Sequence, residues 1–403
     1  MSEKQSCFSC SVLSLILLSF ILGTSEFIIV GILPQIAEGI NCSLAMAGNL
    51  ISFFAFAYAI GTPFFSAITS SYNRYYTLLI LTFIFILGNI ICSFAPNYPI
   101  LIIARVLIAI ISGTLLSISM TFSADIASVQ NQPKVISWIF SGFSIASVFG
   151  VPIGTIITQI LDWRSTFIVL SLFSILILLM LWHYLPNVGP GKKSNLFKQF
   201  TLFKSLRIRF GMFIVIFSAA GSYVFYTYMT PILQDNLLIP TSYISIIFSF
   251  FGISTIISNL LSGRIVNWGG IKKLPLIFFI QAIILVTLSF TMNFTSLGLI
   301  NILCLGIVMY LLNAPIQLLF LNTAKLEKPE AITLASGLNP VSFNIGIALG
   351  SACGGIIISI TDMSLVGIGG AIFALLAMFV NIKLLHIMSS FQFRPIRPNI
   401  KRN

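Results

Sequence analysis

Charged side chains are scarce in this chain. Asp, Glu, Lys and Arg make up only 7% of its 403 residues, and nine residues are acidic, whereas about 25% of the residues of a soluble domain are charged. Hydrophobic residues account for 58% of the chain. Because so few charged side chains cannot cover a water-exposed surface, the composition excludes an ordinary soluble domain. It indicates a membrane protein.

Residues that bind metals or catalyse reactions are also few. The two histidines, His183 and His386, stand near expected helix ends, and GPGKKS (189–194) lacks the spacing of a phosphate-binding loop. Cys7 and Cys10 form a CxxC pair, but no second pair or histidine cluster completes a metal site. The sequence therefore predicts no enzyme, no metal site and no cofactor.

Long apolar runs dominate the sequence. Their apolarity is continuous rather than alternating, which predicts helices and not barrel strands. Most runs can cross the ~30 Å hydrocarbon core at ~1.5 Å of helix per residue. The predicted fold class is an all-α membrane protein with twelve transmembrane helices. These helices are expected at about 11–33, 45–69, 75–95, 98–122, 135–159, 164–185, 207–233, 241–262, 273–292, 296–322, 333–358 and 363–387.

The distribution of positive charge predicts the orientation of the chain. With the N-terminus in the cytoplasm, all of the 21 Lys and Arg residues except Arg105 and Arg164 fall in the tails, the cytoplasmic segments or the adjoining helix ends. The positive-inside rule then places both termini in the cytoplasm and requires an even number of crossings. The net charge of +12 is therefore explained by topology, and no nucleic-acid partner is expected.

A polar segment at 186–210 divides the chain into two sets of six helices. The loops AITSSYNRYY (67–76) and GRIVNWGGIKK (263–273) occupy the same position in each set and share short polar, basic character. Two such halves are expected of a rocking secondary transporter with its site between them near the membrane midplane. We expect an N-terminal half at 1–185, a cytoplasmic linker at 186–206, a C-terminal half at 207–387 and a cytoplasmic tail at 388–403.

Glu26 is the single carboxylate within the apolar runs. An acid at a helix centre in a bilayer costs roughly 2.5–3.5 kcal/mol, so it needs a partner, a proton or a function. Ser19, Gly23 and Glu26 share one helical face because they follow i, i+4, i+7 spacing. We expect Glu26 to carry a proton or to recognise a cation. The alternative is an acid held in a fixed buried hydrogen bond.

Arg105 is the only cation inside an apolar run, and it shares a helical face with Ala109, Ser112 and Ser119. A guanidinium in a membrane must pair with a carboxylate, with backbone carbonyls or with water. Two roles stay open. Arg105 either takes part in proton coupling together with Glu26, or joins its helix to neighbouring helices.

Small residues form two ridges at corresponding positions of the halves. Glycines allow close helix approach, and a proline bends a helix. Paired ridges favour an interface that slides or seals, and ordinary helix packing is the alternative. The ridge residues are Gly142, Gly150, Pro152 and Gly154 in the run 135–159, and Gly346, Gly350 and Gly354 in the run 333–358.

Several of these segments resemble motifs of the major facilitator superfamily. GVPIG (150–154) is similar to its antiporter motif, RVLIAIISG (105–113) to its fourth-helix motif, and DWRSTF (162–167) to the start of its sixth helix. GRIVNWGGIKK (263–273) is similar to its gating-loop motif. The resemblance extends over about 12–387 and implies a fold of twelve helices in two halves.

The gating loops depart from the family pattern. Asn267 stands where the family usually has Asp, and Ser70 and Ser71 stand at the usual Asp-Arg positions of the first loop. The usual charged latch is therefore incomplete. The resemblance implies gating or packing roles for Arg74, Gly263 and Gly270 together with the two ridges.

Three further segments point to one branch of this superfamily: SEFIIVGILPQIA (25–37), TYMTPIL (227–233) and FNIGIALGSACGG (343–355). These segments look like the bacterial drug/proton antiporters, especially the purine-efflux and sugar-efflux-like members. Proton-coupled efflux of a nucleobase, nucleoside or drug is implied. Sugar efflux and uptake by a symporter or uniporter are the alternatives. Glu26 would be the membrane carboxylate of this branch and Arg105 its fourth-helix arginine. The resemblance also implies a protein that works as a monomer in the bacterial inner membrane.

Aromatic and amide side chains are the candidate substrate contacts. Together they could stack on and hydrogen-bond a planar, neutral heterocycle. Tyrosine and tryptophan are also common at membrane interfaces, and buried asparagine often joins helices. The candidates are Tyr58, Trp138, Tyr223, Tyr226, Asn313, Gln317, Asn339 and Asn344.

Overall fold

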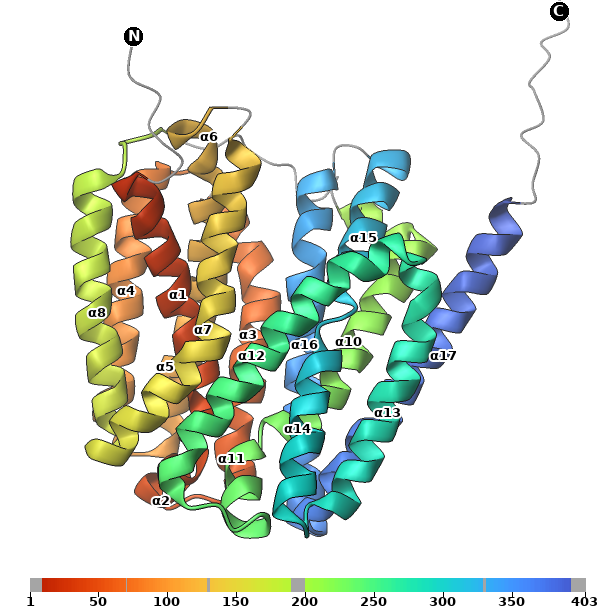
Figure 1. Cartoon of the computed structure of the whole chain (residues 1–403). Helices are drawn as coiled ribbons and strands as arrows, with labels where there is room; N and C mark the ends of the chain where they lie inside the picture. The colour runs from red at the N-terminus through yellow and green to blue at the C-terminus, as the bar shows by residue number, and fades with distance from the viewer. Residues whose placement is uncertain (1–8, 70, 129–130, 190–199, 329–330, 393–403) are drawn as a thin grey trace, which may run out of the picture.

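The structure is a computed structural model that describes residues 9–69, 71–128, 131–189, 200–328 and 331–392. These residues fold into a bundle of long helices (Figure 1). Cys7, Ser70, much of the predicted linker and most of the predicted tail lie outside the described residues.

The first half of the chain forms the helices from α1 to α8. Five of its helices begin after a side chain that accepts a hydrogen bond from a first-turn N–H group: Ser9 before α1, Ser43 before α3, Asn73 before α4, Asn97 before α5 and Asp162 before α8. The elements are α1 (Cys10–Gly31), α2 (Leu33–Ile40), α3 (Leu44–Thr69), α4 (Arg74–Phe94), α5 (Tyr98–Thr121), α6 (Ser123–Ile126), α7 (Gln132–Ile160) and α8 (Trp163–Tyr184).

The second half repeats this pattern with more interruptions. The elements are η1 (Phe200–Lys204), α10 (Leu206–Tyr226), α11 (Met229–Pro231), η2 (Ile232–Asn236), α12 (Thr241–Asn267), η3 (Gly270–Lys273), α13 (Leu274–Thr291), α14 (Thr295–Met309), α15 (Asn313–Glu327), α16 (Ile332–Ile360), η5 (Met363–Leu365) and α17 (Val366–Gln392). Gly269 and Gly270 have φ of 124° and 56°, which lets the chain reverse between α12 and η3.

The membrane-spanning pattern agrees with the sequence. Within the described residues, eleven helical segments are long and apolar enough to cross a bilayer. The predicted helix at 135–159 lies within α7, although the apolar segment found there, Val148–Ile160, is shorter. The prediction of an all-helical membrane fold is confirmed.

Two predicted helices are broken inside the membrane region. The run 207–233 consists of α10, α11 and η2, with a break at Thr227 and Tyr228. The run 296–322 consists of α14 and α15, with a break at 310–312. Both breaks lie in the second half, and backbone of this kind is tolerated at membrane depth only where protein or a cavity surrounds it.

Helices α1 and α7 pack together in the first half, and α10 packs on α16 and α17 in the second. The halves meet where α3 lies against α16 and where α7 lies against α12. Figure 1 shows the start of α1 and the end of α17 at one end of the bundle, which we call the terminal end. Helices α2 and α11 lie at the other, the distal end.

Charge is distributed unequally between these ends. Among the described Lys and Arg residues, Arg164 at the start of α8 is the one at the distal end, and Arg105 lies within α5. Four of the seven described acids, Glu38, Asp162, Asp235 and Asp362, belong to distal helix ends or loops, whereas Asp125 and Glu327 pair with basic residues of the terminal end and Glu26 lies within α1.

Candidate functional site

A small cavity lies between the halves, next to Glu26. Its volume is about 10 Å³, which leaves room for about one water molecule. Both halves contribute to its wall, so the chain forms it without a second copy. The lining residues are Glu26, Phe27 and Val30 of α1, Ile51, Phe54 and Ala55 of α3, Tyr223 of α10 and Ile347 of α16.

The Glu26 carboxyl group is buried and lacks a partner. The residue is 7% exposed, and its Oε2 atom has no hydrogen-bond partner. The ion pairs within the described part of the chain join Arg74 to Asp125 and Arg207 to Glu327, so Glu26 forms no ion pair there. A buried acid without a partner is costly, because nothing replaces the water it has lost.

Arg105 contacts the backbone of α1 and not the carboxylate of Glu26. The guanidinium of Arg105 is fully buried and donates to the Ser25 carbonyl at 2.6 Å and to the Glu26 carbonyl at 3.5 Å. It also lies 4.2 Å from the centre of the Phe54 ring, a favourable position for a cation. The Ser25 hydroxyl donates to Asn89 on α4 at 3.3 Å. Arg105 thus joins α5 to α1 and α3 beside the acid.

Tyr223, which lines the cavity, belongs to a cluster of aromatic rings in the second half. The Tyr223 ring meets Tyr226 edge to face at 5.2 Å and Phe343 at 5.9 Å. Tyr310 stacks on Phe343 at 5.3 Å, and Tyr310 is close enough to interact electrostatically with both Tyr223 and Glu26. The buried Tyr223 hydroxyl has no hydrogen-bond partner of good geometry. Tyr223 therefore connects this aromatic cluster to the cavity beside Glu26.

Of the three predicted tyrosines, Tyr223 lines the cavity, whereas Tyr58 and Tyr226 are not among its lining residues. Tyr58 stacks near Phe54 at 6.5 Å and lies within electrostatic range of Glu26. Tyr226 stacks on Phe251 at 5.1 Å. Sequence reasoning missed Tyr310, Phe54 and Phe343. Tyr310 had one usable signal: it interrupts the 296–322 run together with Asn313 and Pro315.

The predicted amide contacts and Trp138 are not among the residues that line the cavity. Asn313 donates to Asn259 at 2.9 Å, and Gln317 donates to the Ser336 carbonyl at 3.3 Å. Trp138 of α7 is 42% exposed. Asn339 and Asn344 lie on α16, where the Oδ1 atom of each is buried without a partner.

The glycine ridges pack helices within each half. A Cβ atom at Gly142, Gly150 or Gly154 of α7 would strike α1. One at Gly346, Gly350 or Gly354 of α16 would strike α10. Pro152 is buried inside α7. The ridges thus bring α7 onto α1 and α16 onto α10, and a sliding or sealing role stays a prediction.

The two gating-loop regions differ in structure. Arg74 pairs with Asp125 of α6 at 3.0 Å and donates to the carbonyls of Thr121 and Gly189 at 3.3 Å. Gly263 is not in a close helix contact, since a Cβ atom there would meet nothing within 4 Å. Sequence reasoning missed Asp125, although it is the acid that follows the apolar run 98–122 at the end where Arg74 lies.

The halves are joined at the distal end. The Thr230 hydroxyl of α11 donates to the Val30 carbonyl of α1 at 2.6 Å, and Gln159 of α7 donates to the Thr241 carbonyl of α12 at 2.6 Å. Tyr228 is fully buried between Gly48 of α3 and Gly355 of α16. These contacts close the route between the halves on the distal side of Glu26.

Comparison with known protein sequences identifies the family of this chain. The sequence pattern of the Major Facilitator Superfamily matches residues 15–333. The chain belongs to the Major Facilitator Superfamily. It is therefore a multi-pass membrane protein and a secondary transporter, and the prediction that it is not an enzyme is confirmed.

Related transporters match this transporter over most of their length. The "Uncharacterized MFS-type transporter YtbD" of Bacillus subtilis is 34% identical over 348 residues, 86% of this chain and 88% of the relative. "Inner membrane transport protein YdhP" of Escherichia coli K12 is 27% identical over 369 residues, 91% and 94% of the two chains. The "Probable sugar efflux transporter" of Helicobacter pylori 26695 is 26% identical over 362 residues, 90% and 91%.

Solved structures share the fold of the transporter. The crystal structure of the nucleoside transporter NupG superposes with a TM-score of 0.74 at 16% sequence identity and covers 93% of this chain and 99% of that one. At this identity the likeness concerns the fold alone.

Proposed function

We propose that this transporter exports a small organic solute in exchange for protons, and that Glu26 carries the proton. The observation that carries the proposal is the state of that residue: a buried carboxyl between the halves with Oε2 unpartnered and no ion pair among the described residues. A buried acid of this kind marks a functional site by default in a membrane protein.

The position of Arg105 supports this role. Because the guanidinium binds carbonyl groups of α1, Glu26 can gain or lose a proton without breaking an ion pair. The nearby positive charge still favours the ionised acid by Coulomb attraction. Arg105 would therefore tune proton release while it holds α1 in place.

The charge distribution supports an orientation with the terminal end in the cytoplasm, because the described basic residues gather there. The hydrogen bonds Thr230–Val30 and Gln159–Thr241 then close the external side. In this reading the chain is closed to the outside, and rocking of the halves opens the distal end.

The aromatic cluster supports a planar ligand such as a nucleobase, a nucleoside or an aromatic drug. Rings pack well against the faces and edges of Tyr223, Tyr226 and Phe343. Glu26 and the Tyr223 hydroxyl would supply the hydrogen bonds once rocking of the halves enlarges the cavity. Because both halves of one chain complete the cavity, we propose a monomer, in the bacterial inner membrane, as the working unit.

Sugar efflux is the second candidate. The relative from Helicobacter pylori named "Probable sugar efflux transporter" covers nearly the whole chain. A sugar would form hydrogen bonds with Glu26 and Tyr223, which line the cavity, and its apolar ring face would pack against the aromatic side chains.

Proteoliposomes test the coupling. An imposed inward proton gradient should drive uphill counter-movement of nucleobases, nucleosides, drugs or sugars, whereas a symporter would move the solute with the protons. Glu26→Gln should abolish the uphill movement and leave exchange between equal solute concentrations intact.

Glu38→Gln is the matched control, since Glu38 is an exposed acid on the neighbouring α2. It should behave as the native chain does. Uphill transport of normal rate in Glu26→Gln would refute the assignment of Glu26 as the proton carrier.

A further inference from the structure

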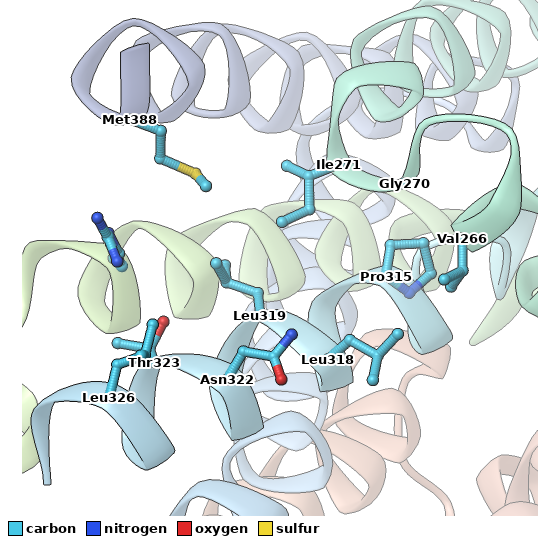
Figure 2. Close-up of a pocket in the computed structure, with 11 residues that line it drawn as sticks. Val266, Gly270, Ile271, Pro315, Leu318, Leu319, Asn322, Thr323, Leu326 and Met388 are labelled. Atoms are coloured by element: carbon cyan, nitrogen blue, oxygen red, sulfur yellow. The ribbon is translucent and has the colours of Figure 1, made fainter. Parts of the chain in front are cut away.

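A larger hollow lies within the second half, away from the cavity beside Glu26. Its volume is about 290 Å³, close to the lower end of the range for small-molecule pockets, about 300 Å³. Figure 2 shows Met388 of α17 and Leu319, Thr323 and Leu326 of α15 around the same space, with Ile271 of η3 above it.

This hollow is separate from the polar contacts of α15. Pro315, Leu318, Leu319 and Leu326 line it from one face of α15, whereas Asn313 and Gln317 lie on the opposite face, where they bond Asn259 and Ser336. The lining is mostly aliphatic, and a hydrocarbon chain packed against it would leave water.

The ends of the membrane spans place the hollow at the membrane surface. Arg207 is the second residue of the span Leu206–Asn236, Gly270 begins the span Gly270–Thr291, and Met388 is next to the end of the span Met363–Ser389. The aliphatic walls therefore border the hydrocarbon region, and the mouth lies at the level of the lipid head groups.

The charge at the mouth is positive. Arg207 is the one charged residue among the described residues that line the hollow. Its pair with Glu327 is long, 3.9 Å, and the two side chains are 30% and 38% exposed, so this pair contributes little. Lys272 and Lys273 follow the lining residue Ile271 in η3, and Lys325 precedes Leu326.

We propose that this hollow binds an anionic phospholipid of the surrounding leaflet. The first part of an acyl chain packs against Leu318, Leu319 and Met388, and Arg207 binds the phosphate in place of Glu327. Basic pockets between membrane helices bind anionic head groups in this way, and a guanidinium makes paired hydrogen bonds to a phosphate. The site does not depend on the direction of transport or on Glu26.

Thermal unfolding of the full chain in detergent, with added phosphatidylglycerol, tests the site. Phosphatidylcholine with the same acyl chains and inorganic phosphate are the two comparison additives. Phosphatidylglycerol should raise the unfolding midpoint most. Arg207→Gln should weaken the apparent Kd about fivefold, which corresponds to about 1 kcal/mol for one basic contact. Leu318→Trp, which fills the hollow, should remove most of the effect, and Arg207→Lys should retain part of it.

Arg209→Gln is the matched control, because Arg209 is exposed on the same helix and does not line the hollow. It should respond to phosphatidylglycerol as the native chain does. An equal response of Arg207→Gln and Arg209→Gln would overturn the proposal. It would also be overturned if phosphatidylcholine, or inorganic phosphate alone, stabilised the chain as much as phosphatidylglycerol does.

Discussion

The hydrogen bond between Thr230 and Val30 should control how often the distal end opens. Thr230 is fully buried, and its hydroxyl donates across the two halves at 2.6 Å. Val30 lies in the last turn of α1, where carbonyl groups lack partners within the helix. Thr230→Val keeps the shape of the side chain but leaves this carbonyl without its donor whenever the halves are closed.

The size of the effect follows from that carbonyl. A buried polar group left unsatisfied costs about 1–3 kcal/mol, and the cost disappears when the distal end opens to water. Thr230→Val should therefore shift the equilibrium toward the distally open state by about 5- to 150-fold. Transport rates should change as well, since the closed state becomes less populated.

Spin labels on both halves measure this shift. Leu161 and Phe294 are suitable sites, because both are exposed, 67% and 61%, and both lie at the distal end, one in each half. After replacement of the native cysteines, the longer label-to-label distance should gain population in Thr230→Val. Thr82→Val is the control, since the buried Thr82 hydroxyl bonds only its own helix, at the Leu78 carbonyl. An unchanged distance distribution in Thr230→Val, or equal shifts in both variants, would refute the reasoning.

Two further predictions concern stability, and thermal unfolding measures both. A Cβ atom at Gly346 would lie 2.5 Å from the Ile216 carbonyl and 2.6 Å from Ala219, so Gly346→Ala should destabilise the chain by about 1–3 kcal/mol. Gly337→Ala, with nothing within 4 Å, should not, and equal effects would contradict the close packing of α16 on α10. Asp162→Ala should cost about 1 kcal/mol, because Asp162 accepts the Ser165 N–H at 2.6 Å. Hydrogen bonds from Ser165 hold the pKa of Asp162 below its usual range. The difference between native chain and variant should therefore be complete above a pH of about 4 and shrink as the pH falls through the lowered pKa; a difference that stays constant would contradict this.

The helices and the two central charged residues were predictable from the sequence. Apolar runs long enough to cross the bilayer are a strong signal, because every backbone polar group in lipid must be satisfied within the helix. Glu26 and Arg105 stood out for the same reason, since charge inside such runs is costly. The positions of the breaks at Tyr228 and Tyr310 were not predictable, because the polar and proline residues beside them also occur within unbroken helices and contacts with other helices decide the local backbone.

The environment of each charged residue needed the structure. Arg105 binds backbone carbonyls of Ser25 and Glu26, and every residue has a carbonyl, so no side-chain pattern could identify these partners. The same holds for Tyr310 and Phe343, which approach Tyr223 only after three separate helices pack. The amides on α15 share a face, but they bond neighbouring helices rather than the cavity beside Glu26.

The attachment of Arg105 to carbonyl groups has a consequence for how this protein can change over evolutionary time. Any residue at position 26 presents the same carbonyl to the guanidinium, so loss of the acid leaves the two hydrogen bonds from Arg105 to the carbonyls of α1 in place. A single substitution can therefore remove the acid without a compensating second mutation. Under the proposed role of Glu26, such a substitution would remove ion coupling on an unchanged scaffold, and a neutral residue at this position in a homologue need not indicate a damaged protein.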